Sequence, residues 1–345
     1  MWFYILLLAS FIFIMGRYNI AGNHFFPPKY SSDIVFFIFL FFAIFRFDVG
    51  FDYPVYYSSI YPNPDLFEIN RWELIPRYIG LLCVHLKQPQ LFFVLMGLPT
   101  YSLLYLTIRK YSLSIYESFI IFFCLFFLDT TSTLRSSLAV SVSFWGIQFI
   151  KEKKLIKYLA ISSLAFLVHK SAIMVVPLYF FYNYVDYKIA IVVDVLLIAL
   201  KAFFLSLISG LNFYAGYLQR LDTLEGGNLI KYFNVIVVFS LLVCALVFRN
   251  MDKAKKFFSV IILGLVYPFI IGNHLGSRVS IYSGIYLCLL WPIVMQNKKC
   301  YFRSLCLSPI YGYFILLLTY SLKNPTRSAY IPYQLIFFAE TTTFR

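Results

Sequence analysis

The chain has 345 residues, of which 61% are hydrophobic and only 13% are charged, and its formal net charge is +14. This apolar share lies far above that of soluble globular domains, and it indicates an all-α, polytopic membrane protein with one integral domain over residues 1–345. The positive excess lies in short loops between apolar runs, as membrane topology requires, so it does not indicate nucleic-acid binding.

The motifs of several large protein classes are missing from the sequence. The six cysteines are scattered and form no metal-ligand pattern, and there is no Walker loop, GxGxxG or GxSxG motif. We therefore predict no metal site and no cofactor, and we do not expect an ATP-driven pump. The first apolar run, Met1–Gly16, lacks a basic n-region and a small-residue cleavage site, so we expect no removable signal peptide.

Apolar runs recur along the chain, and about twelve of them predict spans of a hydrocarbon core that is roughly 30 Å thick. The predicted spans are Met1–Gly16, Ser31–Phe45, Gln90–Ile108, Ile115–Leu128, Leu134–Ile150, two short helices within Tyr158–Tyr182, Ile189–Ser209, Leu229–Phe248, Phe257–Ile271, Val279–Met295 and Leu305–Tyr320.

The longest polar segment, Arg46–Gln88, interrupts this series early. Its glycine and three prolines before residue 65 exclude a long regular helix at its start. Glu68–Leu86 then predicts an amphipathic helix that rests on the membrane surface. Because the segment mixes acidic and basic residues, we place this loop and surface helix, at about 46–88, on the outer side.

Shorter connections complete the predicted topology. We expect tight outer turns at Asp129–Ser132 and Gly272–Arg278, and an outer loop at Gly210–Asn228. The tail Ser321–Arg345 ends outside, and its segment YIPYQLIFF is expected to fold back onto the bilayer.

The orientation follows from Lys151–Lys157, which holds four lysines and one glutamate. Positive short loops face the cytoplasm, so Arg135 and His169 lie toward the opposite face. The run Tyr158–Tyr182 fits either one span or two short helices that meet at His169-Lys170. Only two helices leave the later basic loops inside, so we expect two, with His169 at their outer tip.

Arginines on the outer face need another explanation than membrane orientation. A guanidinium offers a planar fork to phosphate oxygens, so Arg135 and Arg278, which begin spans beside small residues, are candidate phosphate ligands. The alternative is that such arginines are solvated loop charges or contacts to lipid headgroups. His169 is equally compatible with a structural role at a helix end.

Four elements of the sequence together resemble one family. RFDVGFDYPVYY is similar to its Arg-x-x-Val-Gly-x-Asp-Tyr-x-x-Tyr element, and LRSSLAV to its Arg-x-x-x-Ala element. HKSA resembles its His-x-Ser-Ala element, and SRVSIY its late Arg-x-x-x-Tyr element. In this order the elements resemble the EpsG-like branch of Wzy-type polysaccharide polymerases. The chain departs from the family pattern at Phe51, where a small polar residue is commoner.

The resemblance implies a metal-independent glycosyltransferase with a GT-C-like membrane fold, active at the periplasmic face of the bacterial inner membrane. It would join undecaprenyl-pyrophosphate-linked repeat units of O-antigen or capsule, with the lipid bilayer and a chain-length regulator protein as its other partners. The acceptor hydroxyl needs a base, and His169 and Asp52 are the two candidates. The residues implied to bind pyrophosphate or glycan are Arg46, Tyr53, Tyr56, Arg135, Lys170, Arg278 and Tyr282.

Three other membrane activities compete with this interpretation. A lipid-linked oligosaccharide flippase would line a cavity reachable from both faces, whereas the candidate residues here gather toward one face. An O-antigen ligase carries a larger outer loop, and a membrane O-acyltransferase places its histidine in a longer polar stretch. In a lipopolysaccharide ladder, loss of a polymerase leaves core plus one unit, and loss of a flippase or ligase leaves bare core.

Overall fold

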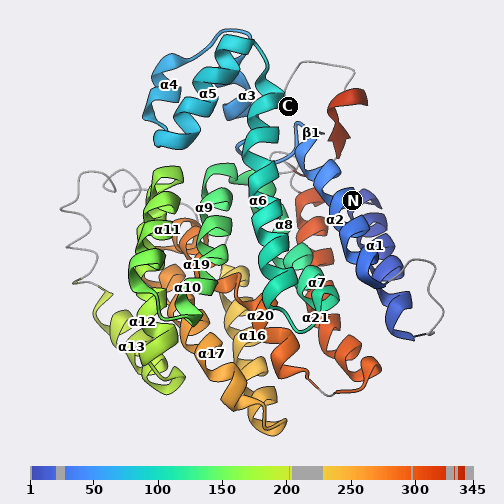
Figure 1. Ribbon diagram of the computed structural model, residues 1–345, viewed down its shortest axis with the longest axis vertical. Helices are drawn as coiled ribbons and strands as arrows, with labels where there is room; N and C mark the ends of the chain where they lie inside the picture. Colours follow the sequence, from blue (N-terminus) through green and yellow to red (C-terminus); the bar gives the residue numbers. More distant parts are fainter. Residues whose placement is uncertain are drawn as a thin grey trace. The chain divides into compact units, whose positions relative to one another are not determined.

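A computed structural model of the chain describes residues 2–20, 28–201, 203, 228–296, 298–323, 330 and 333–338 (Figure 1). Within these residues the protein is all-α apart from one two-stranded sheet, which confirms the predicted fold class at this level. The chain forms two compact units, one of Met1–Trp145, Leu164–Lys170 and Asn297–Arg345, the other of Gly146–Ser163 and Ser171–Gln296. A single integral domain stays a prediction.

The first unit is built on apolar helices that share an aromatic core. Phe39 makes edge-to-face contacts with rings on two following helices, among them Phe119 and Phe127, in the geometry that aromatic pairs favour. The helices of this core are α1 (Trp2–Ile20), α2 (Pro28–Ile44), α6 (Pro89–Tyr111), α7 (Ile115–Leu125), α8 (Phe127–Ser132), α9 (Leu134–Trp145) and α21 (Cys300–Lys323).

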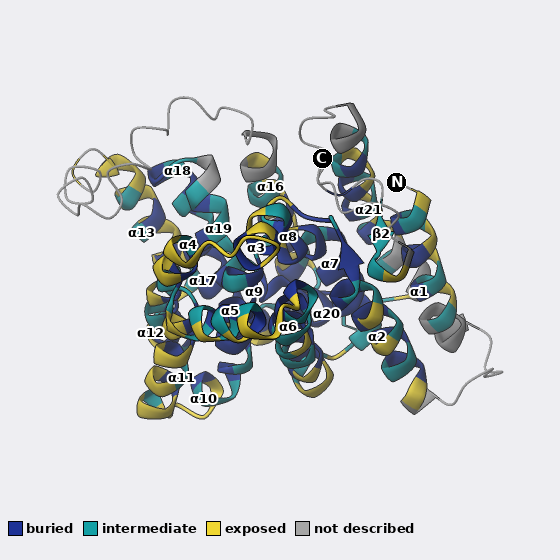
Figure 2. Ribbon diagram, turned by 90° about the horizontal axis from the view of Figure 1, so that it is seen from above, coloured by how far each residue is buried: buried dark blue, intermediate teal, exposed yellow. Residues whose placement is uncertain are grey.

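Three short helices lie beyond the N-terminal end of α6, at the top of Figure 1. They are α3 (Tyr53–Ile60), α4 (Leu66–Arg71) and α5 (Leu74–Leu86). The predicted single helix over Glu68–Leu86 is wrong, because the chain breaks at Trp72-Glu73. Pro76 explains the break: it has no N–H for the carbonyl four residues earlier, and its ring clashes with that carbonyl. Figure 2 shows exposed residues along α4 and α5.

The second unit is arranged around α17 (Met251–Leu265), which packs against most of its neighbours. Its first turn is polar and its remainder is largely buried, so the helix enters the core with its apolar part. The surrounding elements are α10 (Ile147–Lys151), η1 (Lys170–Val175), α12 (Val176–Tyr184), α13 (Tyr187–Ala199), α16 (Asn228–Val247), α18 (Tyr267–Ile270), α19 (Asn273–Gly284) and α20 (Leu287–Val294).

The ambiguous run after the lysine cluster forms two helices that meet at His169. Helix α11 (Leu155–Val168) ends one residue before His169, and the chain turns back through η1 into α12. Tyr158 donates a hydrogen bond of 2.7 Å to the carbonyl of Val175, and Asn183 donates one of 3.0 Å to that of Ile150. The two helices are therefore antiparallel, which confirms the two-helix prediction.

A segment near the end of the chain packs within the first unit, and its predicted contact with the bilayer stays a prediction. Strand β2 (Gln334–Leu335) pairs antiparallel with β1 (Arg46–Phe47), in the register Arg46↔Leu335 and Phe47↔Gln334. A short turn of helix, η4 (Ile336–Phe338), follows β2. Tyr333 stacks on the ring of Phe3 at 3.8 Å, so aromatic packing reinforces the short ladder.

Both predicted tight turns are wrong. Asp129–Ser132 lies within α8, and α19 begins at Asn273, so Arg278 sits inside a helix and not at its mouth. Gly272, with φ +82°, marks the real turn before α19. Apart from Asn228, the predicted loop Gly210–Asn228 lies outside the described residues.

One described helix, α6, is by itself long and apolar enough to cross a membrane. The segments Leu275–Gly284 and Leu287–Val294 pass the same test as one pair bent by 48°. Shorter apolar helices of 10–17 residues occur at seven further places, among them α11 and α21. The count of about twelve spans stays a prediction.

Candidate functional site

The loop Arg46–Asp52 is fixed to the end of α8 by contacts with Thr131 and Ser132. Arg46 is fully buried, and its Nη2 donates a hydrogen bond of 2.8 Å to the carbonyl of Thr131. Gly50 has φ +109°, and a Cβ on it would lie 2.7 Å from the same carbonyl oxygen. Phe51 N–H donates to Oγ of Ser132 at 3.1 Å. The loop thus requires glycine at position 50 for both its conformation and its close approach.

The guanidinium of Arg46 binds backbone carbonyls in and beside this loop and does not reach the protein surface. Besides Thr131 it donates to the carbonyls of Val49, at 3.2 Å, and Ala43. Its carbon lies 5.5 Å from the ring centre of Phe93. With three carbonyl partners and no exposed surface, Arg46 holds the backbone turn, and the geometry lends no support to the predicted substrate contact.

The two tyrosines of the first motif project from α3 in different surroundings. Tyr53 stacks on Phe93 at 4.1 Å and donates to Oε1 of Gln90 at 2.9 Å; burial raises the pKa of this phenol. The hydroxyl of Tyr56 instead accepts a hydrogen bond of 3.2 Å from Nε of Arg135. Tyr53 therefore supports the fold of the loop, and Tyr56 reaches the cation of the second motif.

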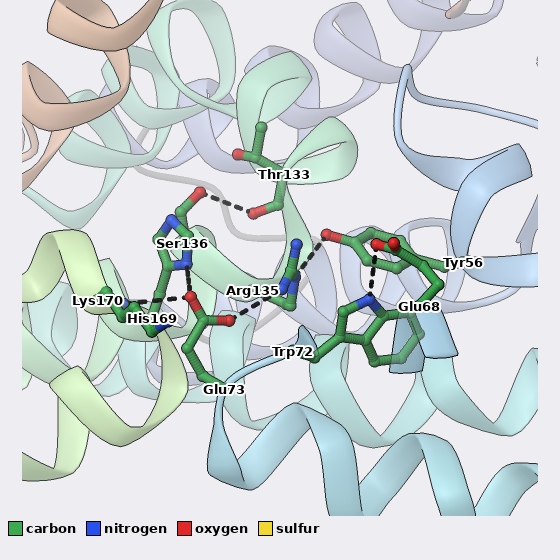
Figure 3. Close-up of polar contacts among 9 residues, drawn as sticks. All are labelled: Tyr56, Glu68, Trp72, Glu73, Thr133, Arg135, Ser136, His169 and Lys170. Carbon is green, nitrogen blue, oxygen red and sulfur yellow. Dashed lines mark hydrogen bonds and ion pairs between the residues drawn. The ribbon is translucent and has the colours of Figure 1, made fainter. Parts of the chain in front are cut away.

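Glu73, which the sequence analysis missed, is the centre of the polar cluster in Figure 3. It lies at the break between α4 and α5, where it precedes the first residue of α5. Its Oε2 accepts a hydrogen bond of 2.9 Å from Nη1 of Arg135, and its Oε1 lies 2.8 Å from Nδ1 of His169. The backbone N–H of Lys170 also points to Oε1, at 3.4 Å.

The carboxylate of Glu73 is largely buried, with 9% of its side chain exposed. Burial raises its pKa, but the hydrogen bond and charge of His169 and the charge of Arg135 lower it more strongly, to about 2. Glu73 is therefore ionised at neutral pH, and both of its oxygens are occupied by basic side chains.

Arg135 is held on three sides and partly open on the fourth. Its guanidinium lies 5.6 Å from the ring centres of Tyr56 and of Trp72, in the arrangement of cation–π contacts. Its side chain is 23% exposed, and among the described residues Nη2 has no hydrogen-bond acceptor. The donors of Nη2 are thus available to an anion from outside the cluster.

His169 and Asp52, the two candidate bases, stand differently toward this cluster. His169 is 24% exposed and directly contacts Glu73. Asp52 precedes α3, is partly exposed, and interacts electrostatically with Arg135. The structure thus brings His169, Arg135 and the backbone of Lys170 around one carboxylate, while Tyr56 and Asp52 interact with Arg135.

Arg278 and Tyr282 belong to the second unit. Tyr282 is buried, and its hydroxyl lies 3.0 Å from Oγ of Ser171. Arg278 lies one turn earlier on α19 and is partly exposed. Because residues four apart share a face of a helix, Arg278 and Tyr282 point to the same side of α19.

No three histidine, cysteine, aspartate or glutamate side chains in the described parts of the chain lie together as a metal-ligand set. The sequence carried one usable signal for Glu73: a proline three positions after it marks the first turn of a helix, and so places Glu73 at the helix start. Its two basic partners, 62 and 96 positions away, could not be inferred from local pattern.

These residues define an all-α, strongly apolar protein in which a buried carboxylate joins an arginine and a histidine. The EpsG family model matches residues 29–335, which is most of the chain. The protein belongs to the EpsG family. Comparison with curated proteins and with solved structures gives no match.

Proposed function

We propose that this EpsG-family protein is a polysaccharide polymerase of the Wzy type. It transfers a growing glycan from undecaprenyl pyrophosphate to a hydroxyl of a second lipid-linked repeat unit of O-antigen or capsule. One observation carries the proposal: Arg135 and His169 contact the two oxygens of the same carboxylate. A phosphate ligand and a base are thereby held side by side, as glycosyl transfer from a pyrophosphate donor requires.

Arg135 supplies the charge for the leaving group. As the bond between the anomeric carbon and the pyrophosphate oxygen breaks, its electron pair stays on that oxygen. The donors on Nη2 of Arg135 stabilise this developing charge, because preorganised cations act where charge appears in the transition state. Since fixed arginines do this, we expect activity to survive chelation of divalent cations.

His169 takes the proton of the acceptor. The hydroxyl oxygen forms the new bond to the anomeric carbon while its proton moves to the imidazole, and the imidazolium later loses that proton to water. His169 is favoured over Asp52 as the base because it shares the carboxylate with Arg135. Undecaprenyl pyrophosphate leaves as the second product.

The length of α11 supports a periplasmic site in the bacterial inner membrane. Its 14 residues, at about 1.5 Å each, make it roughly 21 Å long, with Lys151, Lys153 and Lys154 before its first residue and His169 directly after its last. The lysine-rich loop and His169 are thus at opposite ends of an apolar helix. With the lysines in the cytoplasm, the cluster lies toward the periplasm.

Polymerisation by the purified protein tests the proposal. A synthetic lipid-linked repeat unit should be converted to longer lipid-linked chains, with release of undecaprenyl pyrophosphate. In cells, deletion of the gene should leave lipopolysaccharide core plus one unit. A deletion strain with bare core would instead indicate a flippase or a ligase and would refute the polymerase.

A further inference from the structure

Glu73 has no role in the proposed glycosyl transfer, yet it contacts both Arg135 and His169. It is one of a few largely buried acidic side chains among the described residues, and both of its oxygens meet basic groups. The break between α4 and α5 fixes its position. Trp72 holds that break, since a Cβ on Gly80 of α5 would lie 2.8 Å from the Trp72 ring. This packing fixes the backbone from which Glu73 projects.

The protonation of Glu73 decides which nitrogen of His169 carries a proton. An ionised carboxylate can only accept hydrogen bonds, so Nδ1 of His169, 2.8 Å from Oε1, must be the donor. In the neutral imidazole the other nitrogen, Nε2, then has its lone pair free. A neutral imidazole with the opposite tautomer would turn a lone pair toward the carboxylate and have no free acceptor.

We propose that Glu73 is a positioning residue that holds His169 in the Nδ1–H tautomer and so makes Nε2 the proton acceptor for the glycan hydroxyl. The inference rests on the proposed polymerase function. When the hydroxyl proton moves to Nε2, the imidazole becomes a cation, and the adjacent carboxylate stabilises it. The same carboxylate also orients Arg135. It therefore fixes the separation between the guanidinium that stabilises the leaving group and the imidazole that takes the proton of the acceptor.

Several other charged or titratable groups face this pair. Arg135 comes from α9, Tyr56 from α3, Asp52 from the loop before α3, and Lys170 follows His169 in the chain. The cations Arg135 and Lys170 disfavour an imidazolium at His169, whereas the carboxylates of Glu73 and Asp52 favour it. Glu73 is the acidic group that touches the imidazole, so its removal should change the pH dependence of turnover most.

The substitution Glu73→Gln tests the tautomer directly. A glutamine has one acceptor oxygen and one NH2 group, so it cannot present an acceptor at both the position that faces Arg135 and the position that faces His169. Where the NH2 group faces Nδ1, it selects the wrong tautomer. We expect kcat to fall by roughly 10²–10³-fold, with a smaller change in donor binding. The acid-side loss of activity should also move to lower pH, because the imidazolium loses its counter-ion.

A double-mutant cycle separates positioning from a structural role. If Glu73 acts mainly through His169, Glu73→Gln should lower kcat much less in a His169→Ala background than in the parent, and the remaining effect should reflect its contact with Arg135. Glu68→Gln is the matched control: it makes the same change five positions earlier and keeps an acceptor for Nε1 of Trp72, 3.4 Å away. We expect its activity to stay within about twofold of the parent's, the range of ordinary surface changes.

Glu73→Asp keeps the inference testable if the glutamine variant does not fold. It retains two acceptor oxygens and should keep more activity than the glutamine variant, with the parent's pH profile. Additive effects in the cycle, or an aspartate variant that folds but is inactive, would overturn the role of Glu73. Normal turnover by Glu73→Gln would overturn it too. If the parent protein itself fails to polymerise, the proposed function falls and not this inference alone.

Discussion

Nδ1 of His169 lies 2.8 Å from Oε1 of Glu73, although 96 positions separate the two residues in the chain. The contact joins the turn between α11 and η1 to the break between α4 and α5. Two irregular points of the backbone thus meet, and each presents a side chain that a regular helix would direct elsewhere.

Arg135→Ala and His169→Ala should impair polymerisation in different ways. Arg135→Ala should remove the proposed phosphate ligand from both ground and transition state, so donor binding and turnover should weaken together. His169→Ala should spare donor binding and reduce turnover by roughly 10²–10⁴-fold. Donor binding and single-turnover rates of the purified variants distinguish the two. Normal turnover by His169→Ala would make Asp52 the leading base.

Arg278→Lys should still impair polymerisation. A lysine keeps the charge but cannot reproduce the planar fork that binds two phosphate oxygens at once. Arg278 is partly exposed on α19, so the substitution has room and should leave the fold intact. The measurement is the length distribution of the lipopolysaccharide ladder in complemented cells. A normal ladder would assign Arg278 to the solvated charges.

Gly50→Ala should destabilise the protein by roughly 2 kcal/mol or more, because a side chain there is strained at φ +109° and collides with the Thr131 carbonyl. Thermal unfolding of the detergent-solubilised protein measures the change. Gly312→Ala in α21 is the control, since a Cβ there meets nothing within 4 Å. Its unfolding temperature should stay the same or rise. Equal behaviour of the two variants would contradict the role of Gly50.

Acid should lower the stability of the folded protein, because it protonates Glu73. Its pKa of about 2 in the folded state lies below the ordinary value of 4.5. The stabilisation it provides is therefore fully present above about pH 4.5 and is lost as the pH falls toward 2. The full loss would amount to about 3 kcal/mol. Unfolding temperatures between pH 6 and 3 should fall less steeply for Glu73→Gln than for the parent, and parallel curves would contradict this.

Reporter fusions test the orientation. Fusions at Lys154, Asp252 and Lys298 should report the cytoplasm, and a fusion at Asp65 should report the periplasm. The physical reason is the concentration of lysine in the first three segments. A periplasmic signal at Asp252 would be incompatible with an antiparallel α11–α12 pair that returns to the side of the lysine cluster.

The features that local sequence predicts are the ones whose cause is local. The helical break at His169 follows from a polar, charged interruption of an apolar run, and charge counting alone selected the two-helix arrangement. Arg46 shows the limit: a motif arginine beside an aspartate resembles a phosphate ligand, but its burial and three carbonyl partners depend on tertiary packing. Glu73 was missed for the same reason, because its role depends on contacts with Arg135 and His169, which are far away in the sequence.

The pairing of β2 with β1 has a consequence for the order in which the protein matures. Ser132 Oγ accepts from Phe51 N–H and donates to the hydroxyl of Tyr330 at 2.8 Å, and Tyr333 bonds to the Phe42 carbonyl, 291 positions earlier. During translation, the loop before Asp52 therefore emerges long before the segment that completes it. A nascent chain that already contains every residue of the cluster still lacks this brace, so the Arg46–Asp52 loop should reach its final conformation only after translation has passed Leu335.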